Sequence, residues 1–449
     1  MKKQSDKYFY NTYFKLFGTV ALQNIIVYTV NLADSVMLGS YSEVAMSGVS
    51  LANQIQFLLQ MCAGGTGSGL TVLAGQYWGK KELTPIKKIF SAAFFTGLAI
   101  TLILFLAVLI TPSGVLGILS DESGIVAAGT DYIKIMVHSY FIFMITQILT
   151  ALMRSVENVS VGFYSSILAL VVNIGLNYCL IGGNLGFPEM GVQGAAIATL
   201  CARAVELVYV GFYVFVYDKK LGVRLRDILS LDKNFLRDYL KTGLPVVGSS
   251  SSWGIAMSVQ TAIIGRLGAA AIGANAIASP VFGVVSVLYS SSSNASSVLI
   301  AKTVGEDDSE RVKKYARRLQ KIFIATGLVS SALLMLLKKP ILSFYNVSGD
   351  TLALAEVFIN ILAVTVIGSS YEAPCLCGIV AGGGDTKFVL KNDIIFMWLL
   401  VLPCSAMSAF LFKWPVAVTF FILKADQIAK CFVAVFKVNR FRWIKKLTR

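Results

Sequence analysis

The chain has 449 residues, of which 56% are hydrophobic and only 14% are charged. Soluble proteins average about 45 to 50% apolar and about 25% charged residues, so a soluble multidomain protein could not cover this much apolar side chain. The net charge of +15 would suit a nucleic-acid-binding protein, but the basic residues lie between apolar runs, so we expect a lipid bilayer and no nucleic acid as partner.

Twelve apolar runs have the length of a transmembrane helix, which is about 20 residues. Barrel strands would be about 10 residues long with strict alternation, so helices are needed to satisfy the backbone in lipid. We therefore predict an all-α integral membrane protein with 12 transmembrane helices. In chain order the runs cover residues 14–38, 48–75, 89–111, 130–152, 161–181, 191–217, 242–264, 273–300, 319–337, 352–378, 392–412 and 415–436.

The distribution of Lys and Arg predicts the orientation of the chain. The segments that would share a side with both termini hold 31 of these residues, and the opposite loops hold 4. Because basic loops remain in the cytoplasm, we expect a multi-pass protein of the cell membrane with both termini cytoplasmic, which requires an even number of spans.

An internal repeat relates the two halves of the sequence. A shift of 226 residues aligns the first run with the seventh without a gap, and the register persists for about 75 residues. The aligned identical pairs are Tyr13 and Tyr239, Lys15 and Lys241, Gly39 and Gly265, Ala45 and Ala271, Ala52 and Ala278, Val72 and Val298, Leu73 and Leu299, and Gly79 and Gly305.

Two halves with the same orientation predict a parallel repeat about an axis along the membrane normal. We expect two pseudo-symmetric six-helix bundles around a central cavity, which is a transporter architecture. The predicted parts are an N-terminal bundle at 1–218, a cytoplasmic linker at 219–241, a C-terminal bundle at 242–436 and a basic cytoplasmic tail at 437–449.

The first and fifth runs carry candidate cation ligands. A carboxylate at membrane depth costs about 2.5 to 3.5 kcal/mol, so one that remains there usually has a partner or a function. Asp34 follows Asn31 by three residues, and Asn173 precedes Asn177 by four, so each pair shares a helix face. Their oxygens suit a hard cation or a proton. Alternatively, Asp34 caps the outer helix end, and the two asparagines only bond between helices.

Glu372 follows Tyr371 in the tenth run and has no basic residue one helical turn away. It is a candidate for attracting a cationic substrate or for binding a second proton. The alternative is a carboxyl group that burial keeps neutral. Two further pairs are expected to neutralise each other, Arg203 with Glu206 and Asp426 with Lys430.

Amphipathic organic cations would require aromatic and Met side chains in the cavity wall, because these offer π faces and a deformable surface. Besides Glu372 and Tyr371, the candidate cavity residues are Met37, Phe57, Met61, Tyr140, Met257, Phe282 and Tyr289.

The glycine run at 64–69 superficially resembles a nucleotide loop, but it lies inside an apolar run and no Lys-Ser/Thr follows it. Close helix packing or local unwinding of the helix explains it better. With no Walker-type motif we do not expect ATP as the energy source, and the transporter architecture leads us to expect no enzyme. Seven cysteines without a C-x-x-C pair and a single His give no reason to expect a disulfide framework or a zinc site.

Six short segments spread along the chain carry a resemblance to a known family: NLADSVMLG at 31–39, EVAMSG at 43–48, AGQYWG at 74–79, IGRLG at 264–268, AGGGDTK at 381–387 and RFRW at 440–443. They resemble the multidrug and toxic compound extrusion (MATE) family, within the multidrug/oligosaccharidyl-lipid/polysaccharide flippase superfamily. The resemblance covers nearly the whole chain.

The resemblance implies efflux of small organic, often cationic and amphipathic compounds by alternating access, driven by inward flow of protons or sodium ions. It implies a cation site in which Asp34 faces helix five, where Asn173 and Asn177 match family positions. Asn177 stands where some members carry Asp, so a relay of two carboxylates is not implied. A sodium ion, if it is the coupling ion, would bind at Asp34, Asn173 and Asn177.

Two questions remain open at the level of the sequence. A carboxylate among amide oxygens suits a proton and a sodium ion equally well. The same scaffold could also flip a lipid-linked saccharide, although such flippases often resemble this architecture with extra helices and a strongly cationic cavity. We expect a monomer with no cofactor other than the coupling ion.

Overall fold

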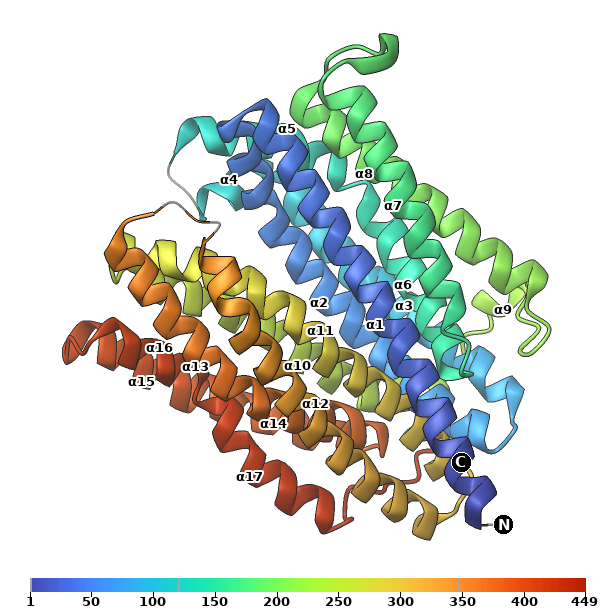
Figure 1. Ribbon diagram of the computed structural model, residues 1–449. Helices are drawn as coiled ribbons and strands as arrows, with labels where there is room; N and C mark the ends of the chain where they lie inside the picture. The colour runs from blue at the N-terminus through green and yellow to red at the C-terminus, as the bar shows by residue number, and fades with distance from the viewer. Residues whose placement is uncertain (1, 120–121, 344, 346) are drawn as a thin grey trace. The chain divides into compact units, whose positions relative to one another are not determined.

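The structure is a computed structural model that describes residues 2–119, 122–343, 345 and 347–449. The described residues form helices joined by short turns, without a β-strand (Figure 1). The N-terminal half contains α1 (Lys2–Tyr41), α2 (Glu43–Gly79), α3 (Leu83–Ile110), α4 (Pro112–Gly117), α5 (Ser123–Met136), α6 (Ser139–Ser155), α7 (Ser160–Ile181), η1 (Asn184–Gly186), α8 (Gly191–Phe212), η2 (Tyr213–Tyr217) and α9 (Leu225–Ile228).

The C-terminal half continues with long helices and several wide π-helical turns. Its elements are α10 (Lys233–Gly265), α11 (Ala269–Gly305), α12 (Ser309–Ser343), α13 (Gly349–Ala373), η3 (Pro374–Val380), α14 (Thr386–Asp393), η4 (Ile394–Val401), α15 (Leu402–Ala406), η5 (Met407–Leu411), α16 (Val416–Lys424) and α17 (Asp426–Asn439).

The twelve predicted runs all lie in helical segments. Within the described ranges, nine helices are long and apolar enough to span a membrane, and α5 with α6 makes a tenth span bent by 56°. The remaining two runs are α10, in which serines at 249–252 lower the hydropathy, and α16 with α17, which a break at Ala425 divides into short helices. The predicted all-α membrane fold is confirmed.

The chain forms two compact units. The C-terminal unit contains the chain up to Ala21 together with 75–81 and 248–449, and the N-terminal unit contains 22–74 and 82–247. Thus α1 begins in the C-terminal unit and ends in the N-terminal unit, whereas α10 does the reverse. The two crossing points, after Ala21 and after Val247, are 226 residues apart, which is the shift of the sequence repeat. These units differ from the predicted bundles at 1–218 and 242–436 because helix ends are exchanged.

Residues that the repeat aligns occupy core positions in both units. Tyr13 in the C-terminal unit and Tyr239 in the N-terminal unit are both completely buried. The other aligned pairs that are buried at both positions are Ala45 and Ala271, Ala52 and Ala278, Val72 and Val298, and Leu73 and Leu299. The repeat therefore preserves packing.

In the N-terminal unit, α7 lies along α8, and α6 packs on both α3 and α8. The glycines of α2 let α10 approach closely. A Cβ atom at Gly65 would lie 2.6 Å from the Cα of Val247, and one at Gly69 would lie 2.6 Å from the Cα of Gly243. Real Cβ atoms do not approach backbone so closely, so the glycine run serves close helix packing, as predicted.

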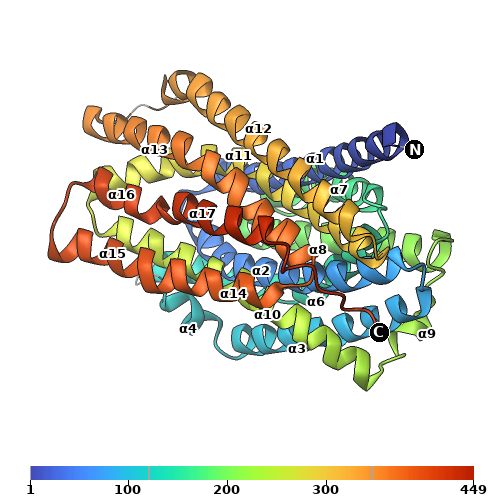
Figure 2. The same ribbon diagram turned by 90° about the horizontal axis from the view of Figure 1, so that it is seen from below.

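In the C-terminal unit, α12 and α17 both pack on α13, and Figure 2 shows these three helices side by side. The stacked rings of Phe358 and Phe420, with centroids 3.7 Å apart, fill the core between α13 and α16. Pro374 follows α13 directly and opens the π-helical turn η3. Proline lacks the N–H that would continue the helical hydrogen-bond pattern, so the wider turn has a local cause.

The ends of α2 and α11 also cross within the C-terminal unit. A Cβ atom at Gly79 would meet the carbonyl oxygen of Lys302, and one at Gly305 would meet the carbonyl oxygen of Gln76. Gln76 and Lys302 are again 226 residues apart. The repeat therefore relates the two contacts to each other: Gly79 is equivalent to Gly305, and Lys302 is equivalent to Gln76. A local twofold axis between the two helix ends requires this equivalence.

The last ten residues, 440–449, form a segment that we call the C-terminal clasp. Trp443 is fully buried against Gly383, and the backbone N–H of Lys445 donates to the carbonyl of Gly383 at 2.8 Å. The side chain of Gln76 accepts from the N–H of Leu447 at 2.9 Å. The clasp thus holds the end of α2 inside the C-terminal unit.

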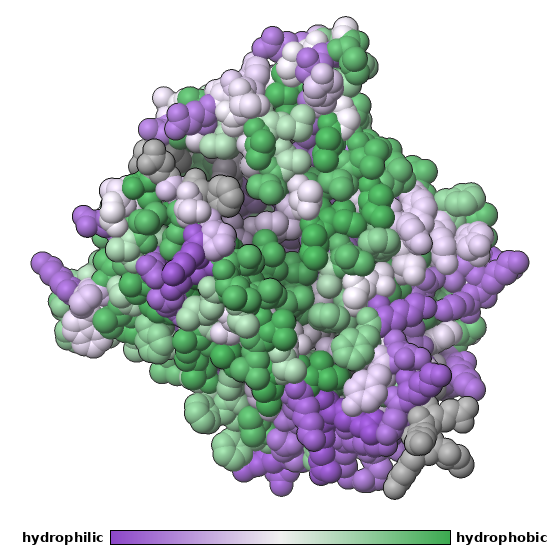
Figure 3. All heavy atoms as spheres, viewed as in Figure 1, coloured by the Kyte–Doolittle hydropathy of each residue, from purple (hydrophilic) through white to green (hydrophobic). Residues whose placement is uncertain are grey.

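The outer surface of α12 is apolar between Lys321 and Lys338, whereas its first turns are charged. Figure 3 shows hydrophobic side chains over α12 and α13 and hydrophilic side chains gathered at the end where α12 begins. Ile324, Leu328 and Leu336 are all exposed. Exposed aliphatic side chains on a long helix indicate contact with lipid.

Candidate cation-binding site

A line of polar side chains connects α1, α7 and α8 in the N-terminal unit. The amide nitrogen of Asn177 donates to Oδ1 of Asp34 at 2.5 Å and to Oδ1 of Asn173 at 3.2 Å. The amide nitrogen of Asn173 donates to the hydroxyl of Thr199 at 3.2 Å, and that hydroxyl donates to the carbonyl of Ala195 at 3.0 Å. The structure thus brings Asp34, Asn173 and Asn177 together, as the sequence predicted.

The asparagines reach Asp34 because of their spacing on α7. Residues four apart lie on one helix face, and this face is turned inward, so Asn173 and Asn177 are both completely buried. Buried polar atoms almost always have hydrogen-bond partners. The carbonyl oxygen of Asn177 has none among the described residues. A buried, unpartnered acceptor therefore lies next to a carboxylate.

The surroundings leave one negative charge at this site. Arg203 and Glu206 form the predicted ion pair, with Nη1 and Oε2 at 3.0 Å, and Arg203 also lies within electrostatic reach of Asp34. A cavity of about 20 Å³, enough for one water molecule, borders Asn173 and Thr199 beside this pair. With all three groups ionised the formal charge is −1, so one monovalent cation would neutralise the site.

The ligands available are oxygens, and this limits the type of cation. Among the residues that the structure describes, no three His, Cys, Asp or Glu side chains converge on a possible metal position. One carboxylate with amide and hydroxyl oxygens fits a proton or a hard monovalent ion such as sodium. The arrangement does not fit a transition metal.

Some of the predicted residues in this unit lie apart from the site. Asn31 shares α1 with Asp34, but its side chain is exposed and makes no hydrogen bond to the other three predicted ligands in the described chain. The candidate cavity residues Met37, Phe57 and Met61 are half-buried, whereas Tyr140 is fully buried. Their contact with a substrate stays a prediction.

In the C-terminal unit, Tyr371 points into the core. Its hydroxyl donates to Oε1 of Gln320 on α12 at 2.7 Å. Phe282 and Tyr289 lie on one face of α11 with ring centroids 6.4 Å apart, and Met257 on α10 is half-buried. Tyr289 also lies within electrostatic reach of Glu372, so these two predicted residues are neighbours.

Glu372 belongs to a charged cluster. The ammonium group of Lys430 lies 3.0 Å from Oδ1 of Asp393 and 3.4 Å from Oδ2 of Asp426, and it is within electrostatic reach of Glu372. The Asp426–Lys430 pair was predicted. Glu372 is not isolated, because its basic neighbour lies on α17 rather than one turn away on its own helix. Ser249 on α10 also hydrogen-bonds to Asp393.

Sequence reasoning missed four residues of these two clusters as functional candidates. Thr199 lies four residues before Arg203 on α8, so the two share a helix face. This spacing could have predicted that Thr199 lies at the polar site. Tyr132 on α5 approaches both Asp34 and Thr199, and nothing in its local sequence marked it. Asp393 is a single charge in its apolar run, and Lys430 was assigned only to its neighbour Asp426, so only the fold shows that Asp393 and Lys430 meet.

Comparison with known proteins shows which family the chain resembles. The family model MatE matches residues 20–179 and 246–407. An uncharacterized transporter of Bacillus subtilis, YisQ, is 24% identical over 99% of this chain and 97% of its own length. A probable multidrug resistance protein NorM of Thermotoga maritima is 24% identical over 95% of this chain and 92% of its own length.

A solved structure shows the same fold. The crystal structure of MATE in complex with MaL6 superposes with a TM-score of 0.85 at 17% identity, covering 96% of both chains. The two segments matched by the family model begin near the two points at which α1 and α10 pass between the units. The resemblance seen in the sequence is confirmed, and the chain belongs to the MATE family of multi-pass membrane transporters.

Proposed function

We propose that this protein is a cation-coupled antiporter that exports organic, cationic and amphipathic compounds by alternating access. The observation that carries the proposal is the hydrogen bond between Asp34 and Asn177 beside an unpartnered buried amide oxygen. A charged group is costly within an apolar helix bundle, and a polar atom without a partner adds to that cost. A bound cation would relieve both.

Either coupling ion would act through the same atoms. A proton would bind the Asp34 carboxylate and change it from a pure acceptor into a donor, for which the free oxygen of Asn177 is a nearby acceptor. The same oxygen and the Asp34 carboxylate would be available to hold a sodium ion. Both events change the link between α1 and α7, and each neutralises one negative charge.

The change at Asp34 would reach the other unit through α1. The part of α1 from Leu22 onward belongs to the N-terminal unit, whereas the part up to Ala21 belongs to the C-terminal unit. A ligand shifts a conformational equilibrium only if it binds the two states differently. A cation that alters the α1–α7 link meets this condition, and each charge that enters down 100 mV supplies about 2.3 kcal/mol.

The proposed substrates follow from charge and from the named relatives. Glu372, Asp393 and Asp426 lie around the ammonium group of Lys430, and Lys424 lies within electrostatic reach of Asp426, which leaves a formal charge of −1 when all five groups are ionised. Phe282 and Tyr289 offer aromatic faces near this cluster. An acidic and aromatic surface suits an organic cation. The relative from Thermotoga maritima, described as a probable multidrug resistance protein, supports efflux as the direction.

We also propose that the protein works as a monomer in the cell membrane with both termini in the cytoplasm. The orientation is supported by the excess of Lys and Arg in the loops that share a side with the termini.

The test is uphill transport by the purified protein in sealed vesicles. A fluorescent organic cation is followed under an imposed pH gradient, an imposed sodium gradient, or neither. We expect accumulation against the dye gradient with one of the two ion gradients and none without. Failure of both gradients to drive the dye, combined with movement of a lipid-linked saccharide between leaflets, would replace the antiporter by the flippase alternative.

A further inference from the structure

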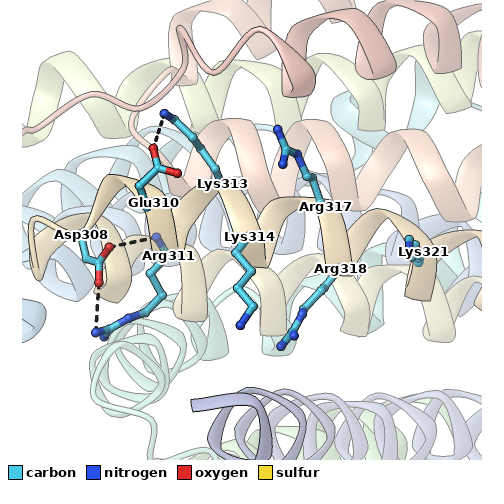
Figure 4. A pocket seen from close by; sticks show the side chains of 8 residues that line it. All are labelled: Asp308, Glu310, Arg311, Lys313, Lys314, Arg317, Arg318 and Lys321. Carbon is cyan, nitrogen blue, oxygen red and sulfur yellow. Dashed lines mark hydrogen bonds and ion pairs between the residues drawn. The ribbon is translucent and has the colours of Figure 1, made fainter. Parts of the chain in front are cut away.

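The first turns of α12 line a surface pocket of about 510 Å³. Six of the eight side chains that line it are basic (Figure 4). They lie on one helix, on which a residue and its neighbours three and four positions away share a face. The lining residues are Asp308, Glu310, Arg311, Lys313, Lys314, Arg317, Arg318 and Lys321.

Four of the six basic side chains are paired with carboxylates, and three of them, Arg311, Lys314 and Arg318, pair with Asp6, Glu306 or Asp308. Lys314 and Arg318 each lie 2.7 Å from an oxygen of Asp6, and Figure 4 shows both side chains on the same side of α12. Arg311 lies 2.6 Å from Glu306 and 3.1 Å from Asp308. These side chains already have partners, so they offer little to a further anion.

The remaining basic residues follow one another at intervals of four and therefore share one face of α12. We call them the open row; they are Lys313, Arg317 and Lys321. Lys313 pairs with Glu310 at 2.7 Å. Arg317 and Lys321 are exposed and form no ion pair with any described residue. The pocket thus carries two uncompensated positive charges on one face of α12.

An aromatic ring supports part of the open row. The ring centroid of Phe441 in the C-terminal clasp lies 5.9 Å from the ammonium of Lys313 and 5.5 Å from the guanidinium of Arg317. A cation over an aromatic face is attracted to it and loses freedom. The contact therefore holds Arg317 in place on α12 before any ligand arrives.

The open row continues into an apolar stripe. Ile324 and Leu328 follow Lys321 by three and seven positions on the same helix face, with exposed fractions of 48% and 56%. At a rise of about 1.5 Å per residue, this apolar stripe begins within about one helical turn of Lys321. Cationic side chains at the end of a lipid-facing stripe match the order of headgroup and acyl chain in a phospholipid.

We propose that Arg317 and Lys321 bind the phosphate of an anionic phospholipid in the leaflet that faces the basic end of α12, with its acyl chains against Ile324 and Leu328. The two uncompensated charges select an anionic headgroup over a zwitterionic one. The exposed aliphatic stripe selects a lipid over free phosphate, because a soluble anion would gain nothing from it. This site is independent of the proposed transport cycle.

The experiment titrates the delipidated, detergent-solubilised protein with phosphatidylglycerol and counts bound lipid by native mass spectrometry. Because each Lys or Arg near an anionic lipid contributes about 1 kcal/mol, the double variant R317A/K321A is expected to bind phosphatidylglycerol about 25-fold more weakly than wild type. The matched control K219A/K220A also removes two exposed lysines and is expected to bind like wild type. Phosphatidylcholine and glycerol 3-phosphate are the competing probes.

A second variant separates charge from folding. R317K/K321R retains both charges and is expected to retain phosphatidylglycerol binding, and the unfolding temperature of each variant is measured without lipid. Equal binding by R317A/K321A and K219A/K220A would overturn the proposal. So would glycerol 3-phosphate that binds as tightly as phosphatidylglycerol, because the site would then recognise a soluble phosphate.

Discussion

The side-chain amide nitrogen of Asn177 donates hydrogen bonds to Asp34 and to Asn173. The side-chain oxygen of Asn177 has no hydrogen-bond partner among the described residues. Replacing Asn177 by Ala removes the donor and the free acceptor together. Hydrogen bonds to charged groups contribute about 1.5 to 3 kcal/mol, so the apparent affinity for the coupling ion should fall about 10- to 100-fold.

The measurement for Asn177→Ala is the dependence of dye efflux on proton or sodium concentration in vesicles. Asn184→Ala is the control, because the side chain of Asn184, at the start of η1, donates to the backbone carbonyl of Tyr178 rather than to Asp34. A wild-type ion dependence in Asn177→Ala would argue against a role for the asparagine in coupling.

The sequence identified candidate site residues, but it did not predict which residues of other helices lie next to them. Asp34, Asn173 and Asn177 were identified through motif positions and helical spacing, and the structure joins them. Glu372 looked isolated because only its own helix was considered, whereas Lys430 approaches from α17. Spacing along one helix predicts a shared face, but an electrostatic interaction between residues 58 positions apart requires the tertiary fold.

At the scale of the elements, the crossing of α2 and α11 gives a direct test. Gly79→Ala would place a methyl group against the backbone carbonyl of Lys302, which cannot move as a flexible side chain would. Overpacking of this kind costs about 1 to 3 kcal/mol of the free energy of unfolding. Gly64→Ala on the same helix meets no atom within 4 Å and should be neutral or stabilising. Thermal unfolding of both variants in detergent measures the difference, and equal stability would refute the close crossing.

The C-terminal clasp predicts a pH dependence. Burial would raise the pKa of Asp385, but hydrogen bonds from Lys437 and Lys445, at 2.7 and 2.8 Å, hold it below the ordinary value of 3.8. A carboxyl group whose pKa is lowered by folding stabilises the protein above its unfolded pKa, and this contribution is lost as the pH falls through the folded value.

Asp385→Asn should therefore be less stable than wild type by a constant margin between pH 8 and pH 5, and the margin should shrink below about pH 4. Unfolding temperatures across this pH range provide the measurement. Asp350→Asn, at an exposed position in the first turn of α13, is the control. A margin that widens as the pH falls would contradict the lysine contacts.

Helix number and type followed from apolar run length, because lipid leaves the backbone no other choice. Details within the helices did not follow. The π-helical turn after Pro374 and the break at Ala425 depend on local backbone geometry that hydropathy does not encode. The helices α2 and α11 also extend beyond the predicted runs 48–75 and 273–300, because helical backbone continues past the ends of the most apolar stretch.

At the scale of the whole molecule, the repeat was visible in the sequence. The sequence did not show that the two units exchange the ends of α1 and α10. The identities at Tyr13 and Tyr239 indicated equivalent positions, and both side chains are buried. Each tyrosine belongs to the unit that is built mainly from the other half of the sequence, and only the contacts in the structure show this. The exchange makes α1 a continuous connection between the units, and Asp34 lies on this helix.

The central claim is that Asp34 couples cation entry to substrate export. The measurement is the simultaneous flux of the coupling ion and an organic cation in the same sealed vesicles, for wild type, Asp34→Asn and the control Asp131→Asn, which changes an exposed acid on α5. We predict that Asp34→Asn loses both uphill export and the accompanying ion entry, whereas Asp131→Asn keeps both. Uphill export by Asp34→Asn at the wild-type rate, with ion entry retained, would contradict the account.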